Sequence, residues 1–390
     1  MSYFDIIVTI IYFIIFPFYL LTKYSKVVLL LYAFHTMFVL AYWNSTNGNC
    51  SADACLYWFM TRITIDPSRT WFTYFGLSTN FLLFLNYPLV KFLRLDFLYG
   101  FLLYGMVGFL GILNLYKMLS HYDYGKVKIQ GIYVWVILLF FPNMHYWTSA
   151  IGKDTLAFFS ISYIFLHVIK NKTINFKVVF VSAFFFLTRP HIAVFLLSSI
   201  GAATILNNKN LALSKRIFLG VLGVIVIPIL VSITLSYWQL DLDVDDINQN
   251  FDAAAFHLSA KAGSAIPMND YILPMKVFTI LFRPFLFDIH DGATLVLATE
   301  NTIAFLLFVW AIKLRLKWKI KLPYQIQAVI FFSAISTIFF SYRDTNLGII
   351  IRMKNMVFPF LLTYLIYIIS YSSLVPYLIA RQRQEQLLKS

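Results

Sequence analysis

Basic side chains stand beside helix-breaking or polar residues wherever a long apolar stretch of this chain is interrupted by GKD, TRPH, FRPF or YRDTN. Arginine donates a planar fork of N–H groups that matches phosphate oxygens, and lysine supplies a compact positive charge. The pattern therefore predicts a site for the phosphate groups of an anionic substrate. The basic residues concerned are Lys153, Arg189, Arg283, Arg343 and Arg352.

Carboxylate, imidazole and aromatic side chains lie in the same segments. Charged groups at membrane depth are costly and normally face a cavity or a partner, so each one is a functional candidate. The carboxylates of Asp154, Asp288 and Glu300 are candidates for a general base that accepts the proton of a substrate hydroxyl. The other candidate substrate contacts, which include an indole suited to stacking on a sugar ring, are His191, His290 and Trp147.

The composition is that of a membrane protein. Of the 390 residues, 60% are apolar and only 12% are charged, and the mean hydropathy is +0.76. A soluble domain has about 25% charged residues, so we expect most of this surface to face lipid. Backbone groups in lipid must be hydrogen-bonded within their own segment, and long continuous apolar runs are typical of helices rather than barrel strands.

The sequence predicts an all-α polytopic transmembrane bundle with about 10–12 spans of about 20 residues each. We expect a single integral membrane domain over residues 1–390. The stretch 76–92 is either a further span or an interfacial helix, and 278–301 is expected to be re-entrant or at the membrane edge. The expected spans lie near 3–22, 27–43, 97–118, 129–147, 154–170, 178–206, 217–237, 301–316, 324–341 and 356–378.

Lysine and arginine in the short loops predict the orientation, because basic loops favour the cytoplasm. The loops assigned to the cytoplasm on this basis include 23–26, 170–177, 209–216 and 313–321. The extracytoplasmic loops are then 44–75, 238–275 and 342–352. The stretch 141–161 joins them if 76–92 lies flat and 178–206 bends at Pro190. If 76–92 is a full span, the same stretch falls on the cytoplasmic side.

Both cysteines of the chain, Cys50 and Cys55, lie in the first extracytoplasmic loop. An oxidising compartment sustains disulfides that the cytoplasm would reduce. The pair is therefore a candidate for a small disulfide ring, and two reduced thiols are the alternative.

Four segments resemble bacterial O-antigen and exopolysaccharide repeat-unit polymerases and related membrane glycosyltransferases: FPNMHYWTSAIGKDTLAFF, TRPHIAVFLL, LFRPFLFDIHDGATLVLATEN and NLGIIIRMKNMVFPFLL. The early SADACLYW loop is also similar. More broadly, the chain resembles the glycosyltransferase-C architecture, whose first outer loop carries an acidic residue at the active site. The resemblance implies that Asp53 acts as the base or positions the acceptor. It implies diphosphate and sugar contacts for Lys153, Arg189, Arg283, Arg343 and Arg352.

Other classes of function find no support in the sequence. The cations adjoin spans and form no separate basic domain, which argues against nucleic-acid binding. There is no H-x-x-x-H pair, no EF-hand spacing in DLDVDD and no D-x-D at Asp53, so we expect no cofactor. A divalent metal stays an alternative that no motif supports. Because phosphate-loop motifs are also missing, a lipid-linked sugar donor is favoured over a nucleotide-linked one.

Together these observations predict a membrane glycosyltransferase of the bacterial inner membrane with its active site facing the periplasm. Its expected donor is a polyprenyl-diphosphate-linked oligosaccharide, and the favoured reaction is the joining of repeat units. Membrane lipids and other polysaccharide-assembly proteins are its expected partners. The alternatives are a transporter or flippase for lipid-linked oligosaccharide and an O-antigen-type ligase. A flippase is expected to show internal repeats and cations along a conduit, which the sequence does not contain.

Overall fold

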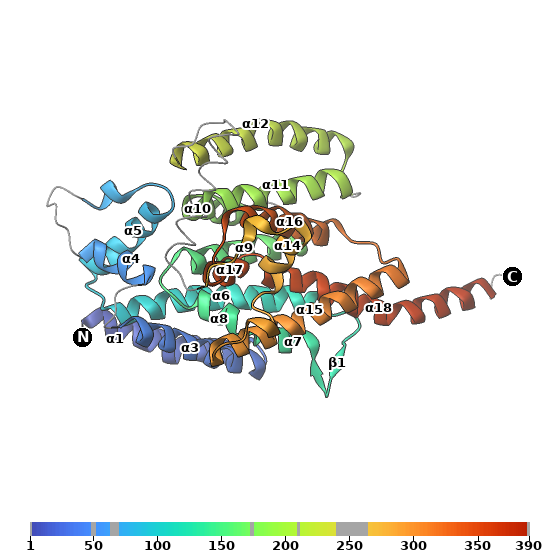
Figure 1. The fold of residues 1–390 in the computed structure, drawn as a ribbon, viewed down its shortest axis with the longest axis horizontal. Helices are drawn as coiled ribbons and strands as arrows, with labels where there is room; N and C mark the ends of the chain where they lie inside the picture. Colours follow the sequence, from blue (N-terminus) through green and yellow to red (C-terminus); the bar gives the residue numbers. More distant parts are fainter. Residues whose placement is uncertain are drawn as a thin grey trace. The chain divides into compact units, whose positions relative to one another are not determined.

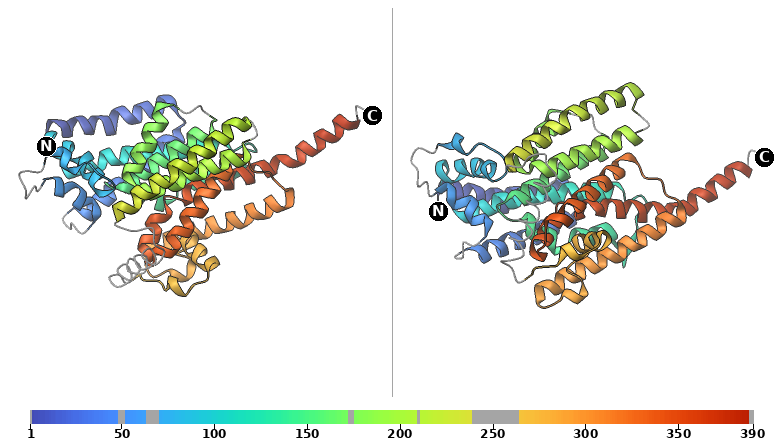
Figure 2. Two further views of the ribbon diagram at one scale, coloured as in Figure 1. Left: turned by 90° about the horizontal axis from the view of Figure 1, so that it is seen from above. Right: turned by 45° about the horizontal axis from the view of Figure 1, so that its top comes forward.

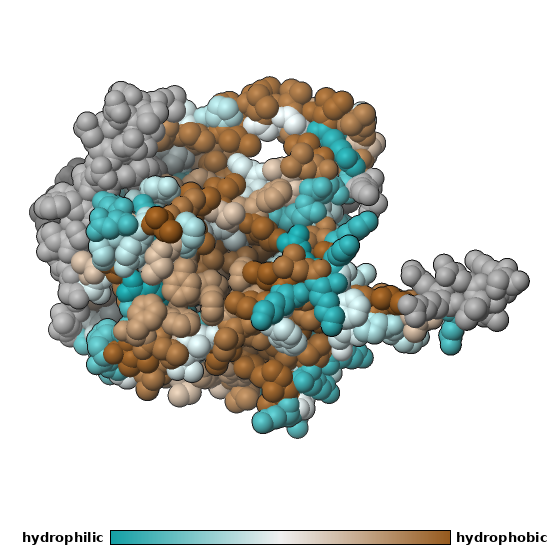
Figure 3. All heavy atoms as spheres, turned by 45° about the vertical axis from the view of Figure 1, so that its right-hand side comes forward, coloured by the Kyte–Doolittle hydropathy of each residue, from teal (hydrophilic) through white to brown (hydrophobic). Residues whose placement is uncertain are grey.

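The computed structural model is almost entirely α-helical, and it describes residues 2–47, 52–62, 70–171, 175–208, 211–238 and 264–387. Within these residues, eight helices are long and apolar enough to cross a membrane: Tyr3–Lys23, Lys26–Thr46, Phe97–His121, Pro190–Asn207, Leu213–Tyr237, Gly292–Trp318, Tyr324–Arg343 and Phe358–Arg381. Hydrophobic side chains make up much of the face shown in Figure 3. The predicted helical, polytopic membrane protein is confirmed at this level.

The chain packs as two compact units. Unit 1 comprises Met1–Asn114, Pro142–Ser198 and Leu222–Asn248, and unit 2 comprises Leu115–Phe141, Ser199–Val221 and Gln249–Ser390. Three helices, α6, α11 and α12, contribute residues to both units. The single domain expected over residues 1–390 stays a prediction.

Unit 1 is built from helices, and α9 and α10 pack side by side within it (Figures 1 and 2). π-Helical turns at Ile11–Ile15 and Pro88–Phe92 continue α1 and α5, and a 3₁₀ turn covers Trp71–Tyr74. Its helices are α1 (Tyr3–Ile10), α2 (Phe16–Lys23), α3 (Lys26–Thr46), α4 (Asp53–Arg62), α5 (Thr79–Tyr87), α8 (Pro142–Thr148), α9 (Lys153–Ile169) and α10 (Phe176–Thr188). The shared helices are α6 (Phe97–His121), α11 (Pro190–Asn207) and α12 (Leu213–Trp238).

Unit 2 contains the longest helix of the described residues, α18, which packs along α15 and α16 (Figure 1). Helix α14 packs against α15, α16 and α17. Two 3₁₀ turns, Met268–Asp270 and Leu286–Asp288, flank α14. The elements are β1 (Lys128–Ile129), β2 (Ile132–Tyr133), α7 (Val134–Leu139), α14 (Leu273–Phe282), α15 (Gly292–Trp318), α16 (Tyr324–Arg343), α17 (Leu347–Lys354) and α18 (Phe358–Leu387).

The expected break within 178–206 is confirmed. Helix α10 ends at Thr188 and α11 begins at Pro190, while Arg189 between them adopts a non-helical φ of −144° and ψ of 81°. The residue before a proline is disfavoured in the helical region, which explains why the break falls at Arg189. Helix α5 and the π-helical turn that continues it cover residues 79–92, which is still shorter than the roughly 20 residues that a span needs.

The span expected at 129–147 is wrong, and it accounts for part of the difference between the expected 10–12 spans and the eight found among the described residues. This stretch begins as a hairpin in which β1 pairs antiparallel with β2. Gln130 and Gly131 both have positive φ, 48° and 83°, as a tight two-residue hairpin turn requires. Pro142 then separates the short helices α7 and α8. Local turn chemistry therefore overrides hydropathy here.

Gly108 of α6 lies directly against the backbone at the end of α8. A Cβ added at Gly108 would lie 1.9 Å from the carbonyl oxygen of Thr148, at the end of α8. Since that oxygen belongs to the backbone, no side-chain rotation relieves the overlap. The glycine therefore lets α6 and the end of α8 touch.

We expect Gly108→Ala to lower the free energy of unfolding by about 1–3 kcal/mol or more, because the two backbones must move apart. Gly201→Ala on α11 is the matched control, since a Cβ at Gly201 meets nothing within 4 Å. Alanine has the higher helix propensity, so this control should be neutral or stabilising by up to about 1 kcal/mol. Thermal unfolding of both variants in detergent measures the difference. Equal thermal midpoints would contradict the close-contact explanation.

Candidate functional site

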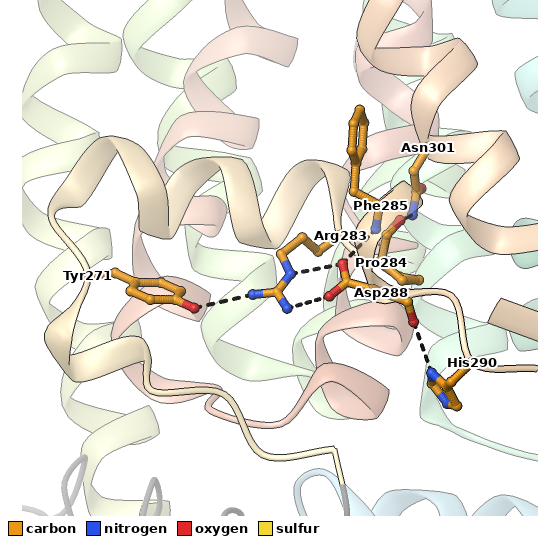
Figure 4. A network of polar contacts seen from close by, with 7 residues as sticks. All are labelled: Tyr271, Arg283, Pro284, Phe285, Asp288, His290 and Asn301. Carbon is orange, nitrogen blue, oxygen red and sulfur yellow. Dashed lines mark hydrogen bonds and ion pairs between the residues drawn. The ribbon is translucent and has the colours of Figure 1, made fainter. Parts of the chain in front are cut away.

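Arg283 and Asp288 form a two-point ion pair in the turn between α14 and α15 (Figure 4). Arg283 Nε donates to Asp288 Oδ2 at 3.0 Å, and Arg283 Nη2 donates to Oδ1 at 2.5 Å. The backbone N–H of Phe285 also donates to Oδ2, at 2.7 Å. A third guanidinium nitrogen, Nη1, donates to the hydroxyl of Tyr271 at 3.4 Å. Asp288 and Tyr271 thus hold the guanidinium group from two different edges and fix its orientation.

These contacts shift the ionisation of both partners in the direction of the charged pair. Hydrogen bonding to Asp288 raises the pKa of Arg283 above its usual value. Burial alone would raise the pKa of Asp288, but the hydrogen bonds from Arg283 and from the Phe285 N–H outweigh it and hold that pKa below its usual value. A carboxylate held in this way is a weak base, so its geometry suits positioning of Arg283 better than proton transfer.

Asn301 connects this turn to α17. Its amide nitrogen donates to the carbonyl oxygen of Pro284 at 2.7 Å, and its amide oxygen accepts a hydrogen bond from the ammonium of Lys354. Lys354 is 1% exposed. Burial lowers its pKa to about 8, while the negative charge of nearby Glu300 acts in the opposite direction. Three segments that are distant in the sequence therefore meet in one network.

The remaining predicted residues of unit 2 lie on α15, α16, α17 and the turn before α15. Arg343 is in the last turn of α16, Arg352 is on α17 and both are half-buried. His290 is exposed and its Nδ1 lies 2.9 Å from the carbonyl oxygen of Asp288. The side chain of Asn346 caps α17 by accepting from Gly348 N at 2.8 Å. The outer loop expected at 342–352 is thus largely the helix α17.

Lys276 on α14 is a functional candidate that the sequence analysis missed. Its side chain is buried, and its Nζ lies 4.3 Å from the centre of the Tyr342 ring. Among the described residues no carboxylate forms an ion pair with it. Thr279, one helical turn along α14, is also buried, and its hydroxyl has no hydrogen-bond partner there. The sequence signal that could have identified Lys276 is a lysine inside the short apolar segment LPMKVFTILF.

Unit 1 holds a second group of predicted residues. Lys153 and Asp154 form the first turn of α9, and Arg189 forms a buried ion pair with Asp154. Lys153 Nζ donates to Ser78 Oγ at 3.2 Å and Thr79 Oγ1 at 3.1 Å. The backbone N–H of Ser78 donates to the carbonyl of Leu187 at 2.7 Å, which fixes this turn against the end of α10. His191, two residues after Arg189, lies in the first turn of α11.

Asp53 lies in the first turn of α4 and is exposed. Four residues later, the Tyr57 ring is 5.7 Å from Lys153 Nζ, so Asp53 lies on the face of α4 that turns toward Lys153. Cys55 on the same helix is disulfide-bonded, and Cys50 lies outside the described residues. Trp147 on α8 is in a separate aromatic group, with its ring 5.2 Å from that of Tyr146.

The predicted residues therefore gather within each unit. Unit 1 brings Lys153, Asp154 and Arg189 together, and unit 2 links the Arg283 turn to Glu300 and Lys354 through Asn301. The shared pocket expected for cations from both groups stays a prediction. In the described part of the chain, no three histidine, cysteine, aspartate or glutamate side chains are grouped as metal ligands. The chemistry that these groups offer is the binding of anions by buried and half-buried cations.

Comparisons with protein-family models, with curated proteins and with solved structures gave no match to this chain. The resemblance to polysaccharide polymerases therefore stays a prediction.

We expect Asp288→Asn to lower the free energy of unfolding at pH 7 by on the order of 1 kcal/mol, since the pair is only partly buried. The contribution of Asp288 is present above the ordinary aspartate pKa of about 4 and is lost as the pH falls through its lower folded value. The gap between variant and wild type should therefore close below about pH 4. Thermal unfolding across this range measures it. Asp270→Asn, at an exposed aspartate, is the control, and a gap independent of pH would contradict the assignment.

Removing only one partner of the Lys354–Glu300 pair should be strongly destabilising. Lys354→Met leaves a buried carboxylate without its cation, and we expect a loss of about 3–5 kcal/mol. The double variant Lys354→Met/Glu300→Gln should recover most of this loss, because no uncompensated charge remains. A double-mutant cycle in mixed micelles measures the coupling, with exposed Lys313→Met as control. Strictly additive losses would show that the two charges do not interact.

Proposed function

We propose that the chain is a glycosyltransferase of the bacterial inner membrane that joins oligosaccharide repeat units carried on polyprenyl diphosphate, at the periplasmic face and with a glycosyltransferase-C-like helix arrangement. The observation that carries the proposal is the basic cluster of unit 2. Its cations are buried or half-buried on α14, α16 and α17 or in the turn after α14, and these three helices pack against one another. Its members are Lys276, Arg283, Arg343, Arg352 and Lys354.

The cluster suits a diphosphate because a leaving diphosphate gains negative charge as its bond to the sugar breaks. Preorganised donors aimed at such charge give the largest single catalytic contribution in many enzymes. Arg283 is already held in one plane by Asp288 and Tyr271. Lys276 is buried against an aromatic ring without a carboxylate among the described residues, and a bound anion would offset the cost of burying that charge.

In the proposed reaction an acceptor hydroxyl attacks the anomeric carbon of the donor sugar. A new C–O bond forms, the bond to the diphosphate breaks with its electron pair leaving on the phosphate oxygen, and the hydroxyl proton passes to a carboxylate. The contacts of Asp288 with Arg283 favour a positioning role for Asp288 in this proposal. Glu300, which lies in the same unit as the cluster, is the candidate base, and the roles predicted for Asp53 and Asp154 stay predictions.

Purified protein in proteoliposomes, supplied with a synthetic polyprenyl-diphosphate oligosaccharide, should produce longer lipid-linked glycans and free polyprenyl diphosphate. We expect Arg283→Ala and Lys276→Met each to lower the rate about 100-fold, the typical loss when one donor to a developing negative charge is removed. Lys177→Ala, which removes an exposed cation of unit 1, should retain wild-type activity.

Three outcomes would overturn the proposal. Arg283→Ala and Lys276→Met variants with wild-type thermal stability and full activity would show that the cluster does not bind the diphosphate. Lipid crossing the bilayer without a new glycosidic bond would indicate a flippase. Transfer of the glycan only to a non-glycan acceptor would indicate a ligase.

A further inference from the structure

An open pocket of about 560 Å³ lies at the turn between α15 and α16, within unit 2. Arg315, Lys321 and Gln327 supply its polar lining, and Ile320, Ile330 and Phe331 supply apolar lining. Arg315 is 14 residues from Asn301 along α15, which corresponds to about 21 Å of helix. The pocket is therefore separate from the Asn301 network.

Hydrogen bonds fix the backbone of this turn. Ile320 N donates to the carbonyl of Arg315 at 3.2 Å, and Lys319 takes the left-handed conformation that reverses the chain after α15. The hydroxyl of Tyr367 on α18 donates to the carbonyl of Lys321 at 2.9 Å. Gln327 Nε2 donates to the carbonyl of Leu322 at 2.8 Å. The pocket therefore lies on a turn between two long helices whose conformation is held by hydrogen bonds.

The two cations of the pocket carry charge that no carboxylate of the described residues balances. Arg315 and Lys321 are exposed, and among the described residues neither forms an ion pair with a carboxylate. They belong to KLRLKWKIK, which has five cations and no acidic residue. The guanidinium and the ammonium therefore favour an anion, and an arginine fork matches phosphate oxygens in particular.

We propose that this pocket binds one anionic phospholipid, with its phosphate on Arg315 and Lys321 and its upper acyl chains against Ile330 and Phe331. The position supports a lipid, because the pocket joins the ends of two helices that are each long and apolar enough to span a membrane. More than half of the lining residues are apolar, and a soluble phosphate would leave these residues exposed to water. Trp318, whose ring lies 5.1 Å from Lys317 Nζ, is of the type enriched at membrane interfaces.

Lipid binding at this turn would stabilise its contacts with α11 and α18. The pocket residue Gln327 accepts a hydrogen bond from the side chain of Asn207 on α11, and Lys321 is joined to α18 by Tyr367. A bound headgroup would screen the repulsion among the cations of the turn that holds these helix ends. The bound lipid should therefore raise the thermal stability of the protein.

The test compares two double variants of the full-length protein in phosphatidylcholine nanodiscs with and without phosphatidylglycerol. Arg315→Gln/Lys321→Gln removes the two pocket cations, and Lys313→Gln/Lys317→Gln removes two exposed cations of α15 that do not line the pocket. Retention of phosphatidylglycerol by native mass spectrometry and the lipid-induced shift in thermal midpoint are measured. We expect one tightly retained lipid in wild type, binding roughly 30-fold weaker in the pocket variant, and nearly wild-type binding in the control.

Equal weakening in both double variants would show diffuse attraction to the basic turn and would overturn the proposal. A further arm adds soluble glycerol phosphate without anionic lipid. If it raises the thermal midpoint as much as phosphatidylglycerol does, the pocket binds a free anion and the lipid assignment is wrong. Phe331→Ala should weaken lipid retention while leaving any effect of glycerol phosphate unchanged.

Discussion

The side chain of Asn301 makes the interaction that holds the Arg283 turn and Lys354 together, because it joins the backbone between two helices to a buried ammonium group. Pro284 lies between α14 and α15, where no helical hydrogen bond serves its carbonyl oxygen, and the Asn301 amide supplies the donor at 2.7 Å. The amide oxygen accepts from Lys354 at the same time. Only a side chain with both a donor and an acceptor does this, since aspartate lacks the donor and leucine lacks both. Polar backbone at membrane depth is tolerated only when such partners are present.

The need of buried polar groups for a partner divides the charged residues into two groups: those paired with a carboxylate and those without one among the described residues. Arg283 and Arg189 form ion pairs with nearby aspartates, and such pairs fix the geometry of a helix break more than they contribute net stability. Lys276, by contrast, is buried against a tyrosine ring and an apolar helix. A cation in that position keeps its capacity to interact with an added anion. The ion pair of Arg283 therefore orients a guanidinium whose remaining N–H groups can still donate to an anion, whereas Lys276 offers a charge that no carboxylate of the described residues balances.

The sequence was sufficient for the membrane class and for the helix break at Arg189, because continuous hydropathy and proline act locally. It failed at 129–147, where the Gln130–Gly131 turn and Pro142 divide an apolar run into a hairpin and two short helices. It also missed Asn301, Lys276 and Lys354. An amide has no distinctive pattern, and a lysine near a helix end resembles any snorkelling lysine. Their significance depends on partners far away in the sequence, which no local pattern encodes. Glu300 was found because a carboxylate within an apolar run is unusual by itself.

The two ends of α15 lie in different environments, a buried polar network at its start and exposed cations at its end. Glu300 and Asn301, near its start, belong to a network in which charges are matched and buried, whereas the cations from Lys313 onward are exposed. The intervening stretch is apolar, and its length of about 18 Å fits within a hydrocarbon layer of about 30 Å. Matched charges can lie at depth because their partners replace water, but the unmatched ones require the interface, where water and lipid headgroups solvate them. The register of α15 in the membrane is thus set by its unmatched cations, and this register holds the Asn301 network toward the opposite side of the bilayer.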